Sequence, residues 1–172
     1  MKRALIFGVI LASTAASSVD WVDLGKTADK EVQIFLDYDS VKRQNITVYG
    51  GASSFRSAKE KPKYISAIFQ STYINRNPLR KKGFYYSKEQ WFISCEDQNY
   101  FVKARIVYGF KDEVMESWQS PKGTLSESDF SYAFPETLAG NNVETACGAI
   151  VLKEIDSTES YEEYLQKYIY DE

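Results

Sequence analysis

Two runs of alternating apolar and polar residues, separated by four polar residues, constrain the fold of this chain most. The runs cover residues 84–95 and 100–110, and the polar residues between them are 96–99. A period of two is typical of a β-strand, and a gap of four residues suits a hairpin. We therefore predict an antiparallel hairpin. Alternate residues on the second run form its more apolar set, which we expect to face the core: Tyr100, Val102, Ala104, Ile106 and Tyr108.

Shorter stretches of alternation predict further strands along the chain. They cover residues 21–24, 32–37, 45–49, 64–73 and 114–118. The sequence DYDS at 37–40 has the side chains of a turn, so the second of these strands should end there. Two asparagines, a proline and a glycine between residues 75 and 83 predict a loop that joins two strands.

The last part of the chain changes from strand to helix periodicity. Val143 and Cys147 lie four residues apart and therefore share one side of a helix, which Gly148 should end. Asp156 with Glu159 matches a capping pattern, which predicts an acidic amphipathic helix over 156–172. Strands followed by helices indicate an α+β fold. We expect an antiparallel sheet of about six strands, packed with the short cysteine-bearing helix and the C-terminal helix.

The first 16 residues have the features of a bacterial-type export signal. Lys2 and Arg3 precede an apolar run over 4–12, and small residues follow, so cleavage after Ala16 is expected. The alternative is an uncleaved anchor helix, although the run is short for a membrane span. No cysteine lies at the cleavage position to carry a lipid. We predict an exported domain over 17–155 without a later transmembrane segment, located in the periplasm, on the outer surface or in the medium.

The chain has two cysteines, Cys95 and Cys147, 52 positions apart. In an oxidising compartment, two cysteines and no others most simply form one disulfide. Closing a loop of that length stabilises the fold by about 4 kcal/mol in the chain-entropy treatment. Two buried free thiols are the alternative.

Positive charge is concentrated in one stretch of a chain whose net charge is −3. Residues 56–88 contain nine basic residues and one acidic residue. Such a stretch, next to aromatic rings, suits a protein or an acidic glycoconjugate as partner, whereas nucleic acid is not expected for an exported acidic chain. Lysines at a hairpin tip that prevent pairing with other chains are the alternative. The candidate partner-binding residues are Arg76, Arg80, Lys81, Lys82, Tyr85, Tyr86 and Lys88.

Residue types argue against several classes of enzyme. The chain contains no histidine, which removes histidine-dependent triads and the commonest zinc ligand, and it has neither a CxxC pair nor a phosphate-binding loop. Paired carboxylates remain as a glycosidase alternative, at Asp37 with Asp39 or at Glu96 with Asp97. We predict no catalytic residues, no metal site and no cofactor. A tyrosinate could ligate haem, with candidates Tyr85, Tyr86 and Tyr108, but ring packing is the simpler role for each.

Three segments carry a resemblance to a known family. They read DWVDLGKTADKEVQIFLDYDSVKR, KEQWFISCEDQNYFVKARIVY and PETLAGNNVETAC. In this order of features the chain resembles the surface-adhesin protein E-like domain family over residues 20–150. The resemblance implies an exported antiparallel domain with a disulfide at Cys95 and Cys147. It also implies adhesion to host matrix and serum proteins through residues 82–91, a link to haem, and a homodimer.

The chain departs from that pattern in ways that bear on function. It lacks the lipoprotein cysteine, and Tyr86 and Glu89 stand where the family adhesin is more basic. Our leading hypothesis is an exported, non-enzymatic, adhesin-like binding protein that uses a basic-aromatic face around 80–88. The alternative is a periplasmic accessory protein that uses the C-terminal helix to contact its partner.

Overall fold

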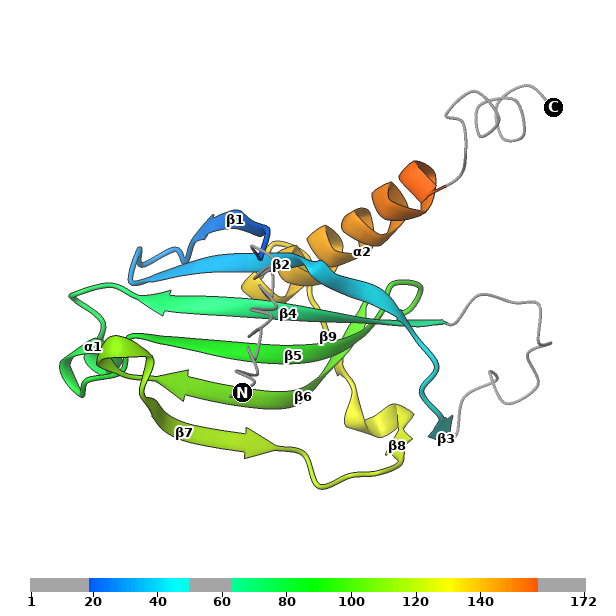
Figure 1. Cartoon of the computed structure of the whole chain (residues 1–172). Helices are drawn as coiled ribbons and strands as arrows, with labels where there is room; N and C mark the ends of the chain where they lie inside the picture. The colour runs from blue at the N-terminus through cyan, green and yellow to red at the C-terminus, as the bar shows by residue number, and fades with distance from the viewer. Residues whose placement is uncertain (1–18, 50–62, 158–172) are drawn as a thin grey trace, which may run out of the picture.

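A computed structural model describes residues 19–49 and 63–157, which form an antiparallel sheet with one long helix, α2, on one face (Figure 1). The strands are β1 (Trp21–Lys26), β2 (Val32–Gln44), β3 (Val48–Tyr49), β4 (Tyr64–Tyr73), β5 (Tyr86–Ser94), β6 (Asn99–Tyr108), β7 (Val114–Gln119), β8 (Leu125–Ser126) and β9 (Ser131–Tyr132). The helices are α1 (Pro78–Lys81) and α2 (Leu138–Ser157). The predicted α+β class is confirmed. The proposed signal over 1–16 lies outside the described residues.

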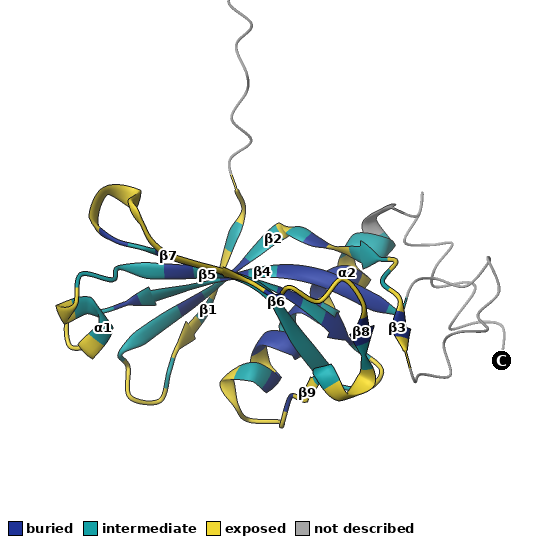
Figure 2. Cartoon of the chain, turned by 90° about the horizontal axis from the view of Figure 1, so that it is seen from below, coloured by how far each residue is buried: buried dark blue, intermediate teal, exposed yellow. Residues whose placement is uncertain are grey.

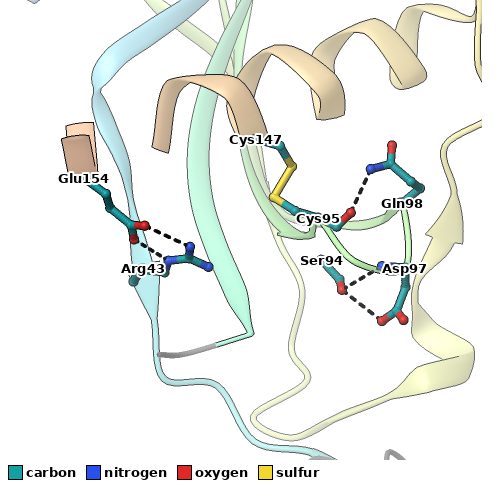
Figure 3. Close-up of a disulfide and its surroundings, with 7 residues drawn as sticks. All are labelled: Arg43, Ser94, Cys95, Asp97, Gln98, Cys147 and Glu154. Atoms are coloured by element: carbon teal, nitrogen blue, oxygen red, sulfur yellow. Dashed lines mark hydrogen bonds and ion pairs between the residues drawn. A yellow bond between two sulfur atoms is a disulfide. The ribbon is translucent and has the colours of Figure 1, made fainter. Parts of the chain in front are cut away.

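The main sheet has the order β1-β2-β4-β5-β6-β7, and β9 also pairs with β6. The central hairpin of β5 and β6 is confirmed, with Ser94 opposite Asn99. Its loop is held by local bonds: the Ser94 hydroxyl donates to Asp97 Oδ2 at 2.9 Å, and Gln98 Nε2 donates to the Cys95 carbonyl at 2.7 Å (Figure 3). The polar residues that predicted the turn are therefore those that close it.

The predicted end of the second strand at Asp37 is wrong, because β2 continues to Gln44. The pairing of β2 with β4 shifts between Asp37 and Lys42, as at a β-bulge. Ser40 occupies this irregularity: its backbone N–H donates to Asp37 Oδ1 at 3.2 Å, and its hydroxyl oxygen accepts from the Ile68 N–H at 2.8 Å. The turn-forming side chains thus stabilise a bulge inside a strand.

A second bulge makes the predicted core face of β6 only partly right. Trp91 lies opposite Val102, but the adjacent Gln90 lies opposite Ala104, so Lys103 is an extra residue. Beyond this point the side chains of β6 exchange faces, since strand periodicity is two. Tyr100 and Val102 pack against the main core as predicted, whereas farther along the buried residue is Val107.

α2 covers one face of the sheet and contributes four buried residues to the main core (Figure 2). Thr137 precedes the helix, and its hydroxyl oxygen accepts from the Gly140 N–H at 3.1 Å, as an N-cap does. The helix residues that face the sheet are spaced three and four apart, namely Val143, Ala146, Ala149 and Ile150. They contact a sheet face formed by Leu36, Val41, Ile65, Ala67, Phe69, Trp91 and Ile93.

The prediction that Gly148 ends this helix is wrong, because α2 runs on to Ser157. Ala149 and Ile150 are 6% and 5% exposed, so burial against the sheet continues past the glycine. Arg43 Nε then pairs with Glu154 Oε1 at 2.9 Å (Figure 3). Tertiary contacts therefore override a local stop signal. Asp156, predicted to open a separate helix, lies within α2, and residues 158–172 lie outside the described part of the chain.

The opposite sheet face carries a smaller core at one end. β3 and β8 form a short parallel pair, and Val48, Tyr64 and Leu125 are buried there. Phe92 and Phe101 of the central hairpin pack against this group. Both faces of the sheet are thus covered near β3 and β8.

The two cysteines form the predicted disulfide, with a sulfur–sulfur distance of 2.05 Å and Cα atoms 5.7 Å apart. The bond joins the residue after β5 to the middle of α2 (Figure 3). A disulfide is compatible with an exported location. No helix among the described residues is long and apolar enough to cross a membrane.

Replacing both Cys95 and Cys147 with alanine should lower the free energy of unfolding by about 4 kcal/mol, because the 52-residue loop is no longer closed in the unfolded chain. Urea denaturation under non-reducing conditions would measure the loss. The reduced wild-type chain is the control and should unfold with the variant. Equal midpoints for the oxidised wild type and the variant would show that the cross-link does not stabilise the fold.

Candidate functional site

The predicted basic residues gather at the end of the sheet where α1 joins β4 to β5 (Figure 1). The Asn77 side chain caps α1 by accepting from the Leu79 N–H at 2.8 Å. Pro78 is the first residue of this single helical turn, where a backbone N–H would have no partner within the helix, so its absence costs nothing. Gly83, with φ of +90°, then lets the chain turn back toward β5. Arg76, Lys81 and Lys82 are exposed on this connection.

One group of side chains, the Arg80 cluster, consists of Arg80, Tyr85, Phe110 and Lys111. The Arg80 guanidinium carbon lies 3.1 Å from the Tyr85 ring centroid. The Tyr85 ring contacts Phe110 with centroids 5.6 Å apart, and Lys111 Nζ lies 5.6 Å from the Phe110 ring. Two cations thus bracket two aromatic rings, each within the range of a cation–π contact.

A second group, the Lys88 cluster, consists of Lys88, Trp21, Tyr86 and Tyr108. Lys88 Nζ lies 5.2 Å from the Trp21 ring and 5.9 Å from each tyrosine ring. The two tyrosines are a cross-strand pair and stack with centroids 4.6 Å apart and planes 18° from parallel. The ammonium group is therefore held among three rings.

The candidate residues form two clusters because the sheet separates them. Tyr85 and Tyr86 are adjacent in an extended segment, where consecutive side chains point to opposite faces. Their contacts agree, since Tyr85 touches Arg80 and Phe110 whereas Tyr86 touches Tyr108 and Lys88. The cations at this end are consequently presented on both sides of the sheet.

Tyr86 is the tyrosine whose environment bears on the haem alternative. Its hydroxyl donates to Asp112 Oδ1 at 2.7 Å. Burial, together with this hydrogen bond and the charge of Asp112, raises the pKa of Tyr86 to about 12. The phenol therefore stays protonated at neutral pH, and Tyr86 is not prepared to act as a tyrosinate ligand.

Two of the four carboxylates considered for catalysis have structural roles. Asp37 stabilises the bulge of β2, and Asp97 accepts from Ser94 and forms an ion pair with Lys63. Asp39 and Glu96 are exposed. Within the part of the chain that the structure describes, no group of three histidine, cysteine or acidic residues could hold a metal ion.

Trp21, Phe110 and Lys111 complete the two clusters but were not among the sequence-predicted site residues. The sequence offers only a weak signal for Phe110 and Lys111, since Phe110 ends the second run of the predicted hairpin and Lys111 directly follows it. It offers none for Trp21, because the contact with Lys88 depends on how β1, β2, β4 and β5 are ordered in the sheet.

No match to this chain exists among protein-family models, curated proteins or solved structures. The resemblance to the surface-adhesin protein E-like domain therefore stays a prediction.

Replacing Tyr86 with phenylalanine should remove one tyrosine that ionises near pH 12. The raised pKa means that the folded state keeps a proton that the unfolded chain loses near pH 10. The associated stability is therefore complete below pH 10 and is lost as the pH rises toward 12. Ultraviolet absorbance of tyrosinate, followed during alkaline titration, measures this step. The wild-type chain, titrated under the same conditions, is the control and should show the late step.

Proposed function

We propose that this chain is an exported, non-enzymatic binding protein of adhesin-like type. It contacts a protein or an acidic glycoconjugate of a host or cell surface through the cations around α1. The observation that carries the proposal is the arrangement of this end of the sheet. Arg80 and Lys88 are held against aromatic rings, while Arg76, Lys81 and Lys82 project from the connection between β4 and β5.

The exposed cations differ in function from the ring-bound ones. Lys81 and Lys82 make no ion pair with any described residue, so their charges are available to an acidic partner. Arg80 and Lys88 already have aromatic partners within the chain. Their ring contacts order the surface beside the free lysines, which reduces the entropy lost when a partner binds.

The second candidate function is a periplasmic accessory protein whose partner contacts the C-terminal part of the chain. It is supported by two apolar side chains on the last described turns of α2. Val151 is 47% exposed and Leu152 is 57% exposed, which is unusual for neighbouring large apolar residues on a helix. In this second candidate function, the partner contacts Val151, Leu152 and residues 158–172.

We further propose that the homodimer implied by the resemblance would pair through β7. All six residues of β7 are exposed, and no described strand pairs with its outer side. The Ser120 N–H donates to the Lys103 carbonyl at 2.9 Å, so in the alternating pattern the N–H groups of Ser117 and Gln119 point away from β6. They are positioned to bond a second strand.

Reversing the charges of Lys81 and Lys82 to glutamate should weaken binding to heparin, used as an acidic polysaccharide probe, by about tenfold, or ~1.4 kcal/mol. Wild-type binding should fall as salt is raised, because exposed charges are screened. Salt elution from a heparin column measures both effects. Lys42→Glu with Lys153→Glu is the control, because it makes the same change in net charge at two positions away from the α1 end of the sheet. Equal losses in both double variants would mean that net charge, not the α1 surface, determines binding.

Ending the chain after Ser157 separates the two candidate functions. The described fold is complete at that residue, so the urea midpoint should change little. Under the leading proposal, heparin affinity is also unchanged. If instead a periplasmic protein that co-purifies with the full chain is lost on truncation while heparin affinity persists, the accessory function is favoured.

A further inference from the structure

β3 and β8 lie at the opposite end of the sheet from α1 (Figure 1). A pocket of about 390 Å³ lies beside them. Its volume is in the range of small-molecule sites in proteins. It is formed between the segment that contains β3, the segment that leads into β8, and the sheet face beneath them. The lining residues are Asn45, Ile46, Thr47, Tyr49, Phe92, Lys103, Lys122, Gly123, Thr124 and Leu125.

The apolar part of the pocket belongs to a packed region. Leu125 is 5% exposed, and Ile46 and Phe92 pack against the same small core. Tyr49 lines the pocket too but is 66% exposed, so its ring is available to a ligand. A firm apolar base with an accessible aromatic ring suits a ligand that presents a flat or weakly polar face.

The charge of the lining is positive. Lys103 and Lys122 line the pocket, and none of the lining residues is acidic. Lys122 forms an ion pair with Asp129, which does not line the pocket and whose pKa is lowered by the Lys122 hydrogen bond. Lys103 makes no ion pair with a described residue and donates to two neutral acceptors, the carbonyls of Ser120 at 3.5 Å and Lys122 at 3.2 Å.

Lys103 is the cation that an anionic ligand would meet. An ammonium group has three N–H donors, and two of them are used by these carbonyls, so one donor and the positive charge remain. The two bonds also fix the position of the group at the pocket wall. Lys103 lies two residues after Phe101, so strand alternation places both on the sheet face that carries the small core and the pocket.

We propose that this pocket binds a small organic anion that carries a hydroxylated ring, of the class of acidic monosaccharides. The carboxylate of the ligand pairs with Lys103, and its ring packs against Tyr49 and Phe92. Its hydroxyl groups bond to the amide of Asn45 and the hydroxyls of Thr47 and Thr124. This site is separate from the α1 surface and does not depend on the function proposed for that surface.

The test uses glucuronate as the probe, with glucose and acetate as controls for the ring and the charge. The full mature chain is titrated with each compound and followed by the backbone amide signals of Thr47, Gly123 and Thr124. Glucuronate should shift these signals and bind at least tenfold more tightly than either control. Absence of the shifts, or equal affinity for acetate or glucose, overturns the proposal.

Two variants locate the binding. Gly123→Phe should block the pocket and abolish the shifts. A Cβ there meets nothing within 4 Å and no positive φ is required, so the fold should tolerate the change. Lys103→Met keeps the aliphatic stem but removes the charge, and it should weaken glucuronate at least tenfold. The Lys81→Glu, Lys82→Glu variant should bind glucuronate as the wild type does. Binding that survives Gly123→Phe, or that is lost in the α1 variant, contradicts this assignment.

Discussion

The packing of α2 against one face of the sheet is the interaction on which the rest of the structure depends. Val143 and Ala146 are fully buried, and they face sheet residues such as Leu36, Ile65 and Ile93 that are equally inaccessible to solvent. The small alanines let the helix approach the strands closely. A helix with two glycines and two asparagines has little intrinsic stability, so its existence over 20 residues is a consequence of this contact.

α2 covers one face of the sheet, and the two ends of the sheet differ in how their positively charged side chains are held. At the α1 end, cations lie on aromatic rings on both sides of the sheet. At the other end, the β3–β8 pair covers the face opposite α2 and leaves a positively charged pocket beside its small core. Cationic side chains therefore occur at both ends of the sheet, although the net charge of the chain is −3. At the α1 end they contact aromatic rings, and at the other end they line a pocket.

The regular parts of this fold were predictable from local periodicity, and the irregular parts were not. The β5–β6 hairpin and β4 follow from alternation alone, and the disulfide follows from the presence of two cysteines in a chain with a predicted export signal. The bulge around Ser40 adds three residues to β2 and the bulge at Lys103 adds one residue to β6. Both were missed because an odd number of extra residues leaves the composition of a strand unchanged while it inverts every later side chain. The Lys88 cluster was predicted only in part, since the meeting of Trp21 with Lys88 depends on strand order. The pocket was not predicted, because its lining comes from three segments far apart in the sequence.

The disulfide also imposes an order in time. Cys147 follows every strand that the structure describes, so it is synthesised only after the whole of the described sheet-forming sequence. Until then the thiol of Cys95 has no native disulfide partner within the chain and stays open to exchange with other thiols and disulfides. The cross-link can therefore form only after all the described strands have been synthesised.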